Sequence, residues 1–592
     1  MIDLKGKPFN LGESDIEWVN DTLKGMTLQK KIGQLFCPLG ISANRKQLLH
    51  LTQDIGIGGI MFRPTKGKQA QSTHRFLQDN SKIPLLIAGN LESGGSGAAA
   101  DGTFFGMPMQ IAATGNPDMG YNLGKISCGE GAAVGLNWAF APIVDIDRNF
   151  RNPITNLRTF GSNPDTVITM AKGYMRAADE CGVAVSIKHF PGDGADERDQ
   201  HLLTSVNGLS TEEWDNGYGR VYSSLIEQGA RTVMVGHIAL PSYQDLLSGG
   251  GTKDKTIPAT LSKELMCGLL REKLGFNGLI VTDASPMAGF RAAMKRADAV
   301  PLAIQNGADM FLFARDLATD YKYMADGVES GRLSESRLDE AVTRILALKA
   351  SLRLHIKAEE HCLVPPPDAL DTLNDKQSRK LTAQCADESV TLIKDTQKLL
   401  PISPKTHKRV YLNVLEKSDA MSTALKNKLK QKLLAEGFEV TVRDRAAIAD
   451  LGIFVSSEKT SLLKKASVIF KARKHLGELI GAPNVFTEKY DLVIYAACFE
   501  TASENTVIRI NWKGFKGAGD DIPWFVNDVP TMFISLANPY HLLDVPMIKT
   551  YINAYSNNDE VIDAVIGKIL GRSEFKGVSP VDASCGREDV LY

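Results

Sequence analysis

The chain has 592 residues, too many for one ordinary domain, and 43% of them are hydrophobic and 23% charged, as in soluble globular proteins. A formal net charge of -1 argues against nucleic acid or an anionic membrane as a partner. The 8 cysteines stand singly, which argues against a disulfide framework and against a cysteine-bound metal. No signal-like or bilayer-spanning apolar stretch occurs, so we expect a cytoplasmic protein, whose oligomeric state the sequence does not indicate.

The first part of the chain alternates short apolar runs with amphipathic segments of helix length, a pattern typical of a parallel sheet. About eight such runs occur, the number that a TIM barrel needs, and they predict a (β/α)8 TIM-like barrel over residues 1–355. In chain order the runs are GQLFCPL, IGGIMFR, PLLIAGN, WAFAPIVDI, VAVSIKHF, RTVMVGHI, GLIVTD and GADMFLF.

Polar side chains stand at the ends of most of these runs. In chain order they are Asn90 and Glu92, Asp145 and Asp147, Lys188 and His189, His237, Asp283, and Arg315 and Asp316. Because the carboxyl ends of barrel strands face one mouth, which carries the active site in TIM-barrel enzymes, we expect these side chains to surround a reaction site.

Three consecutive prolines in CLVPPPDAL interrupt the helical pattern and predict a linker over residues 356–386. A second alternation follows and predicts a doubly wound α/β sandwich domain over residues 387–592. Its predicted strands are RVYLNVL, FEVTVRD, DLVIYAA, PTMFISLA and IKTYINAY. Neither a Gly-rich dinucleotide fingerprint nor a P-loop occurs, so we expect no nucleotide cofactor.

Asp283 ends the apolar run GLIVTD, so its carboxylate would lie at the rim of a low-dielectric barrel. A carboxylate there can act as a nucleophile or a general base. An Asp at a strand-to-helix turn also commonly caps the next helix, and from the residue alone both interpretations stay open.

His201 follows Asp199 by two positions, and a carboxylate partner suits a histidine that transfers protons near neutral pH. A solvated surface pair is the alternative. Lys188 and His189 likewise either bind a polar ligand or merely finish a strand.

Taken together, these segments resemble glycoside hydrolase family 3. KHFPGDGADERDQH, residues 188–201, resembles the family segment K-H-F-P-G-H-G-x-x-x-x-D-S-H, in the branch of bacterial β-N-acetylglucosaminidases that includes β-glycoside phosphorylases. The segments NWAFAPIVDID, NPITNLRTFG, VMVGHIALP and GLIVTDASPMAG resemble further barrel elements, and ADESVTLIKDTQKLLPI resembles the start of the second domain. The resemblance covers nearly the whole chain and is weakest after about Leu400.

The resemblance implies a retaining, exo-acting β-glycosidase. It implies that Asp283 is the nucleophile of a covalent glycosyl-enzyme and that His201, paired with Asp199, is the general acid/base. The charged loop would then have to fold over the end of the seventh strand. The implied substrate-binding residues are Lys188, His189, Arg158, Asn90, Asp147 and Met287. No metal or organic cofactor is expected, and the implied partner is a small β-glycoside or an oligosaccharide.

Three positions depart from the family pattern: Asn90 stands where an Asp is usual, Asp193 replaces a His, and Pro286 replaces a Ser. These departures leave both β-glucosides and β-N-acetylglucosaminides as expected substrates.

Three alternative functions remain open. The first is a phosphorylase that transfers the sugar to inorganic phosphate, since a histidine acid/base is neutral after giving up its proton and does not repel an anion. The second is a sugar-binding homologue without activity, against which stand the retained Asp283, Asp199 and His201. The third is a metal-dependent hydrolase using His189, His201 and Asp283, against which stands the absence of an H-x-H or H-E-x-x-H spacing.

Overall fold

The computed structural model describes residues 2–250, 256–416, 422–443, 483–504, 506, 509–510, 512 and 522–592. The chain forms two compact units. The first comprises Met1–Ala112, Asn116–Thr382 and Ala502–Thr506, and the second comprises Ala113–Gly115, Ala383–Thr501 and Val507–Tyr592. A short segment from late in the chain therefore belongs to the first unit.

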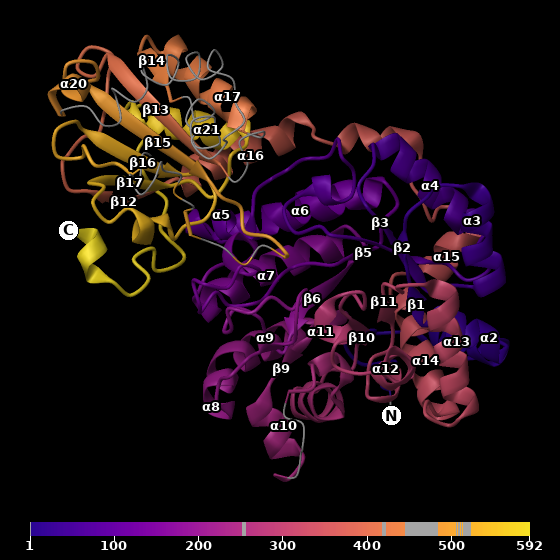
Figure 1. Ribbon diagram of the computed structural model, residues 1–592. Helices are drawn as coiled ribbons and strands as arrows, with labels where there is room; N and C mark the ends of the chain where they lie inside the picture. Colours follow the sequence, from indigo (N-terminus) through magenta and orange to yellow (C-terminus); the bar gives the residue numbers. More distant parts are fainter. Residues whose placement is uncertain are drawn as a thin grey trace, which may run out of the picture. The chain divides into compact units, whose positions relative to one another are not determined.

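The first unit is built on a ring of parallel strands, and each of the eight predicted runs contributes to it (Figure 1). In chain order the ring strands are β1 (Phe36–Cys37) with β2 (Leu39–Gly40), β3 (Gly59–Phe62), β4 (Leu86–Gly89), β5 (Trp138–Ala139), β6 (Ala184–Phe190), β8 (Thr232–Val235), β10 (Leu279–Thr282) and β11 (Phe311–Leu312). The predicted barrel is confirmed.

The first run forms two short strands because Pro38, which has no N–H to donate, separates them. On one side β1 pairs with β11, and on the other β2 pairs with β3. The Val281–Met310 bridge and the bond from the Thr282 N–H to the Met310 carbonyl join β10 to the eighth strand. These contacts close the ring.

Helices lie outside the ring (Figure 1), where their apolar faces cover the strands. Neighbouring helices pack together, among them α1 with α14, α6 with α7, α7 with α9, and α12 with α13. The helices of this unit are α1 (Glu13–Lys24), α2 (Leu28–Gln34), α3 (Arg45–Leu49), α4 (Gly67–Asp79), α5 (Pro108–Ala113), α6 (Asp118–Ala133), α7 (Pro164–Glu180), α8 (Thr211–Trp214), α9 (Arg220–Gln228), α10 (Pro241–Leu247), the π-helical η6 (Glu264–Lys273), α11 (Ala288–Arg291), α12 (Arg296–Gln305), α13 (Leu317–Glu329) and α14 (Glu335–Ser351).

The predicted linker contains helical structure. The end of α15 (Leu354–Glu359), the short helix η7 (Pro367–Thr372) and most of α16 (Lys376–Ser389) lie within it. The boundary between the two units falls inside α16.

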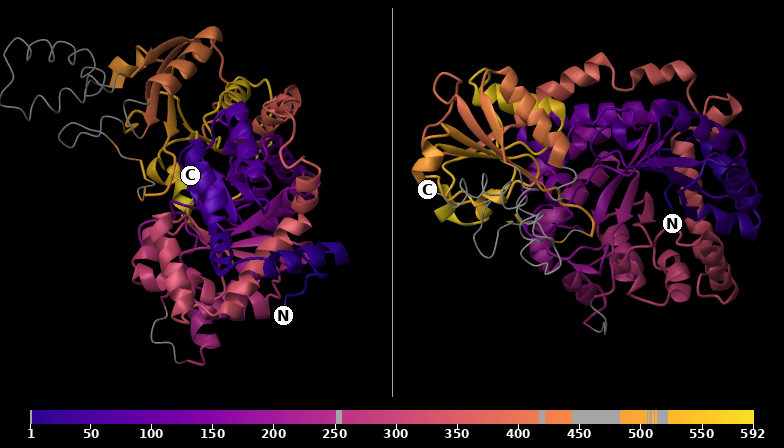
Figure 2. Two further views of the ribbon diagram at one scale, coloured as in Figure 1. Left: turned by 90° about the vertical axis from the view of Figure 1, so that its right-hand side faces the viewer. Right: turned by 45° about the horizontal axis from the view of Figure 1, so that its top comes forward.

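The second unit contains one six-stranded sheet, in the order β12-β17-β16-β15-β13-β14. Its strands are β12 (Thr391–Asp395), β13 (Arg409–Glu416), β14 (Glu439–Val442), β15 (Leu492–Cys498), β16 (Thr531–Ser535) and β17 (Thr550–Asn553), and its helices include α17 (Ser422–Ala435), α20 (Pro483–Thr487) and α21 (Asp559–Ile569). All five predicted strands occur and run parallel, while β12 pairs antiparallel with β17 at one edge. The strands and helices of this α/β fold are visible from two sides in Figure 2.

In the described part of the chain, no helix has the length and apolar character needed to cross a membrane.

Candidate active site

Glu92, in the loop after β4, is the centre of a buried group of charges. Its carboxylate accepts two hydrogen bonds from Arg158, at 3.0 Å from Nε and 2.9 Å from Nη2. It also accepts one from Lys188 Nζ, at 2.7 Å. Burial alone would raise the pKa of Glu92, but the two cations outweigh it and hold the pKa well below its usual range. The three side chains form a fixed, ionised cradle for polar groups.

Lys188 and His189 lie inside β6, near its carboxyl end, rather than after it. The Nδ1–H of His189 donates to Asp145 at 2.7 Å, and the main-chain N–H of His189 donates to the same carboxylate at 3.0 Å. This pairing fixes the ring and turns Nε2 towards Asp283, whose Oδ2 lies 3.9 Å away. His189 therefore stands between two carboxylates.

Asp283 directly follows β10, and its Oδ1 accepts a hydrogen bond from the Ala284 N–H at 2.6 Å. Burial raises the pKa of Asp283, but the charges of nearby histidines, His189 foremost, outweigh it and leave the pKa below its usual range. The helix-capping alternative gains no support, since this bond goes to the adjacent residue and α11 begins only at Ala288. Asp283 is a nearly buried, ionised carboxylate.

His201 and Asp199 form a hydrogen-bonded pair. The Nδ1–H of His201 donates to Asp199 Oδ1 at 2.7 Å, and the main-chain N–H of His201 donates to the same oxygen at 2.8 Å. Burial raises the pKa of Asp199, but hydrogen bonds from His201 and from the Glu504 main chain outweigh it and lower the pKa. An ionised Asp199 stabilises an imidazolium, which can give away its Nε2 proton.

The loop that carries His201 and Asp199 is hydrogen-bonded to the turn after Asp283. The N–H of Ala288 donates to the His201 carbonyl at 2.9 Å, and the N–H of Gly289 donates to the Gln200 carbonyl at 3.2 Å. A Cβ atom at Gly289 would lie 2.6 Å from that carbonyl oxygen, so only glycine allows the approach. The loop thus lies against the end of the seventh barrel strand.

Ser503 and Glu504 approach the same pair from far along the chain. Ser503 Oγ lies 3.0 Å from Nε2 of His201. The main-chain N–H of Glu504 donates to Asp199 Oδ2 at 2.7 Å. Both residues belong to the segment Ala502–Thr506 that groups with the barrel.

The other predicted site residues have different surroundings. Asn90 is exposed, and its side chain makes no hydrogen bond to any described residue. Asp147 is buried and accepts a hydrogen bond from the Thr155 hydroxyl at 2.8 Å, while Met287 is 8% exposed and lies immediately before α11.

The sequence interpretation placed Glu92 and Asp145 among the side chains around the reaction site but gave neither a role, and it did not include Ser503. Glu92 and Asp145 stood in the series of strand-end carboxylates, which was a signal for both. No sequence signal pointed to Ser503. Among the described residues, no group of three His, Cys, Asp or Glu side chains is arranged to hold a metal ion.

The sequence also matches a known enzyme family, in agreement with the carboxylates and histidines found at the strand ends. Residues 27–348 match the N-terminal domain of glycosyl hydrolase family 3. The chain belongs to glycosyl hydrolase family 3. Over 592 residues it is 41% identical to a β-N-acetylglucosaminidase/β-glucosidase of Cellulomonas fimi, with 100% of both proteins covered.

Two solved family 3 structures have the same fold. The β-glucoside phosphorylase BglX bound to 2FGlc is 43% identical, with a TM-score of 0.88 over 98% of this chain and 99% of that one. A family 3 β-N-acetylglucosaminidase from Paenibacillus sp. strain FPU-7 is 22% identical, with a TM-score of 0.75 over 94% of this chain and 99% of that one, and its likeness shows the fold alone. The predicted family, fold class and enzyme class are confirmed.

Proposed function

We propose that this enzyme is a retaining, exo-acting β-glycosidase for β-glucosides or β-N-acetylglucosaminides. The observation that carries the proposal is the pairing of an ionised Asp283 with a separate acid/base, His201, held by Asp199. A nucleophilic carboxylate and a proton donor are the two groups that retaining chemistry requires.

In the first step, an oxygen of Asp283 attacks the anomeric carbon of the sugar. The bond between that carbon and the glycosidic oxygen breaks, and the oxygen takes the Nε2 proton of His201. The products are a covalent glycosyl-enzyme, a free alcohol and a neutral His201.

In the second step, a water molecule gives a proton to Nε2 of His201 as its oxygen attacks the anomeric carbon. The bond to Asp283 breaks and the carboxylate is regenerated. Two inversions give net retention, and no metal or organic cofactor takes part.

Substrate binding rests on the cradle around Glu92. The carboxylate of Glu92 accepts hydrogen bonds from sugar hydroxyls, while Lys188 and Arg158 donate to them. Asn90 offers a neutral amide in place of a charge, and His189 has its Nε2 facing the position of the reacting sugar. The Cellulomonas fimi relative, named for both activities, supports both sugars as substrates.

The test is a panel of 4-nitrophenyl glycosides that differ in the sugar and in anomeric configuration. We expect turnover of the β-glucoside, the β-N-acetylglucosaminide or both, with the β-anomer as the first product detected by NMR. No turnover of either β-glycoside, or a first product with the α-configuration, would contradict the proposal.

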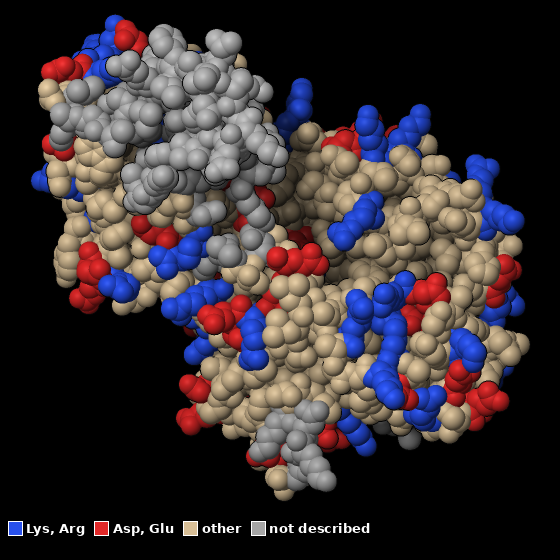
Figure 3. Space-filling view, viewed as in Figure 1, with Lys and Arg blue, Asp and Glu red and all other residues tan. Residues whose placement is uncertain are grey.

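Transfer to phosphate is the second candidate function, favoured by the likeness to BglX and by the histidine acid/base. After the first step His201 is neutral, so an approaching phosphate meets a neutral acid/base side chain, with the carboxylate of Asp199 on the far side of the ring at Nδ1. Three cations near the site have carboxylate partners already, since Lys188 and Arg158 bind Glu92 and Arg198 Nε lies 2.6 Å from Asp196. On the face drawn in Figure 3, Lys and Arg are interspersed with Asp and Glu. Binding of phosphate would therefore depend on a few hydrogen-bond donors close to the site.

Turnover of an aryl β-glycoside with increasing phosphate separates the two functions. Formation of sugar 1-phosphate at a rate that rises with phosphate identifies a phosphorylase. Free sugar as the sole product at every phosphate concentration identifies a hydrolase.

A further inference from the structure

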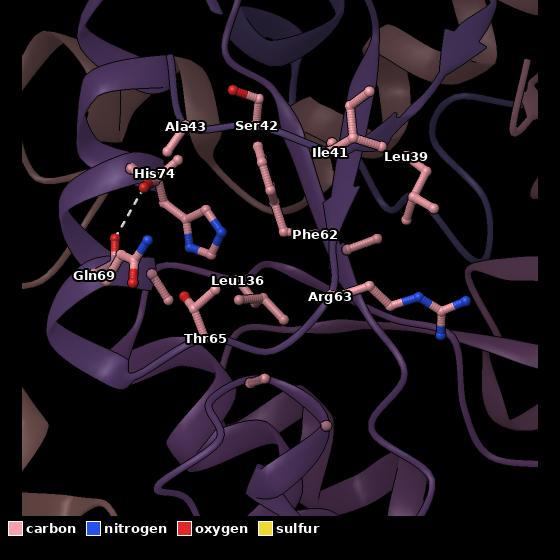
Figure 4. A pocket seen from close by; sticks show the side chains of 16 residues that line it. Leu39, Ile41, Ser42, Ala43, Phe62, Arg63, Thr65, Gln69, His74 and Leu136 are labelled. Carbon is pink, nitrogen blue, oxygen red and sulfur yellow. Dashed lines mark hydrogen bonds between the residues drawn. The ribbon is translucent and has the colours of Figure 1, made fainter. Parts of the chain in front are cut away.

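A cavity of about 370 Å³ lies at the carboxyl ends of β2 and β3, beside the first turns of α4 (Figure 4). Its volume is within the range of small-molecule sites. Gly97 and Ala98, in the loop after β4, form one wall. None of the residues proposed above for catalysis or sugar binding is among its described lining residues.

The interior of the cavity is mainly apolar. Phe62, Leu39, Leu136 and Ala88 line it, and the rings of Phe62 and His74 have centroids 6.0 Å apart. The described lining includes no Asp, Glu or Lys. An apolar ring fits such walls, whereas a cation finds no counter-charge in them.

His74 supplies a hydrogen-bond acceptor inside the cavity. Its side chain is only 3% exposed, and its ring points towards Phe62 and Leu136 (Figure 4). Nδ1 lies 2.7 Å from the Val134 carbonyl and so carries a proton that it donates. Burial lowers the pKa of His74 to about 4, so the ring is neutral near pH 7 and Nε2 bears a lone pair. No described residue donates a hydrogen bond to Nε2.

Nε2 is not fully enclosed by protein atoms, so a ligand in the cavity can reach it and donate one hydrogen bond to it. A sugar suits the cavity less well than a compact alcohol. Ser42, Thr65, Gln69 and Thr73 also line the cavity, but sugar hydroxyls that face Leu39, Leu136 and Ala88 would have no partners. A carboxylate does not suit the cavity. Arg63 is the one charged residue of the described lining, and its exposed guanidinium extends away from His74 (Figure 4).

We propose that this cavity binds a compact apolar alcohol of the phenol type, with its ring against Phe62 and Leu136 and its hydroxyl donating to Nε2 of His74. Phenols are the alcohols that aryl β-glycosides release, so an alcohol of the leaving-group class would bind in a cavity that the proposed catalytic residues do not line. The cavity and its donor requirement do not depend on the proposed catalytic function.

The test measures binding to the full-length protein by calorimetry, using phenol, anisole, glucose and benzoate. Phenol is expected to bind most tightly. Anisole, which has no O–H, is expected to bind about five- to tenfold more weakly because one hydrogen bond is lost. Diffraction from crystals soaked in 4-bromophenol is expected to place the bromine in this cavity.

Three variants sharpen the test. His74→Phe removes the acceptor but keeps an aromatic ring, so phenol and anisole should bind to it equally. Ala43 is exposed on the rim. Ala43→Trp should fill the cavity and reduce phenol binding at least tenfold, while Ala43→Ser, the matched control, should bind phenol like the wild type. The two Ala43 variants decide the outcome even if the His74→Phe protein does not fold.

Equal affinity of the wild type for phenol and anisole would overturn the proposal. So would unchanged phenol binding to Ala43→Trp, tighter binding of glucose or benzoate, or bromine bound at another place.

Discussion

The hydroxyl of Ser503 lies 3.0 Å from Nε2 of His201, although the two residues are 302 positions apart in the chain. Nε2 is the nitrogen that gives its proton to the leaving group in the proposed mechanism. The neighbouring Glu504 N–H binds Asp199 at 2.7 Å, so this late segment contacts both members of the acid/base pair. The orientation of the imidazole therefore rests on Ser503 as well as on Asp199.

Replacing Ser503 with Ala should slow the cleavage of substrates with poor leaving groups about three- to tenfold, the effect of one lost hydrogen bond. Activated dinitrophenyl glycosides, which need little protonation, should be cleaved at the wild-type rate. Steady-state kinetics on both substrate types measures the effect. Ser503→Thr is the control, because it keeps the hydroxyl and should restore cleavage of the poor substrates. An equal loss on both substrate types would mean that Ser503 supports the loop and not the acid step.

The barrel was predictable because its strands are buried on both faces and appear in the sequence as nearly continuous apolar runs. The antiparallel edge strand β12 was not predicted. Its sequence TLIKD is short and carries two charges, so its strand character depends on pairing with β17.

The D-x-H spacing of Asp199 and His201 predicted the acid/base pair, and the rest of the site was predictable only where its residues lie at the ends of strands. Asp283, Lys188 and His189 could be found in this way, because strand ends converge in a barrel. The pairing of Glu92 with Lys188 could not, since it joins residues 96 positions apart in the chain. The approach of Ser503 to His201 depends on how a segment from beyond the barrel returns to it, and a single sequence carries no signal for such a contact.

Asp283→Ala should lower turnover of aryl β-glycosides by at least about four orders of magnitude, because the covalent route loses its nucleophile. The fold should persist, since among the described residues the carboxylate accepts one hydrogen bond, from the adjacent main-chain N–H, and its other close partner is His189 Nε2 at 3.9 Å. A slow 2-fluoro sugar substrate should label Asp283 in the wild type, and peptide mass spectrometry locates the label. Labelling of Glu92 or Asp145 instead would disprove the assignment.

His201→Ala should reduce the cleavage of phenyl glycosides about 10²- to 10⁴-fold and that of dinitrophenyl glycosides far less, because only the poor leaving group needs the proton. Asp199→Asn should show the same pattern more weakly, since it keeps a hydrogen-bond acceptor near Nδ1 but loses the charge that stabilises the imidazolium. A leaving-group series for each variant provides the measurement. Parallel losses across the whole series would indicate that His201 binds the sugar.

Asp193 stands where the family segment has a histidine, and its side chain is buried within the loop that carries the acid/base pair. Its carboxyl accepts hydrogen bonds from Asn152 at 2.8 Å, from the Gly194 N–H at 2.7 Å and from Gln200 at 3.3 Å. Burial, followed by the charge of Asp145, raises the pKa of Asp193 to about 7. The ionised form is therefore less favourable in the folded protein than in the unfolded chain.

A carboxyl whose folded pKa is raised stabilises the fold below its unfolded pKa, near 4, and loses that contribution as the pH rises towards 7. Asp193→Asn cannot ionise and still offers a carbonyl to Asn152 and Gly194. The stability of the variant relative to the wild type should therefore increase between pH 5 and pH 8, by on the order of 1 kcal/mol or more. Thermal unfolding of both proteins across this pH range measures the difference. A difference that does not change with pH would show that Asp193 is already ionised at pH 5 in the folded protein.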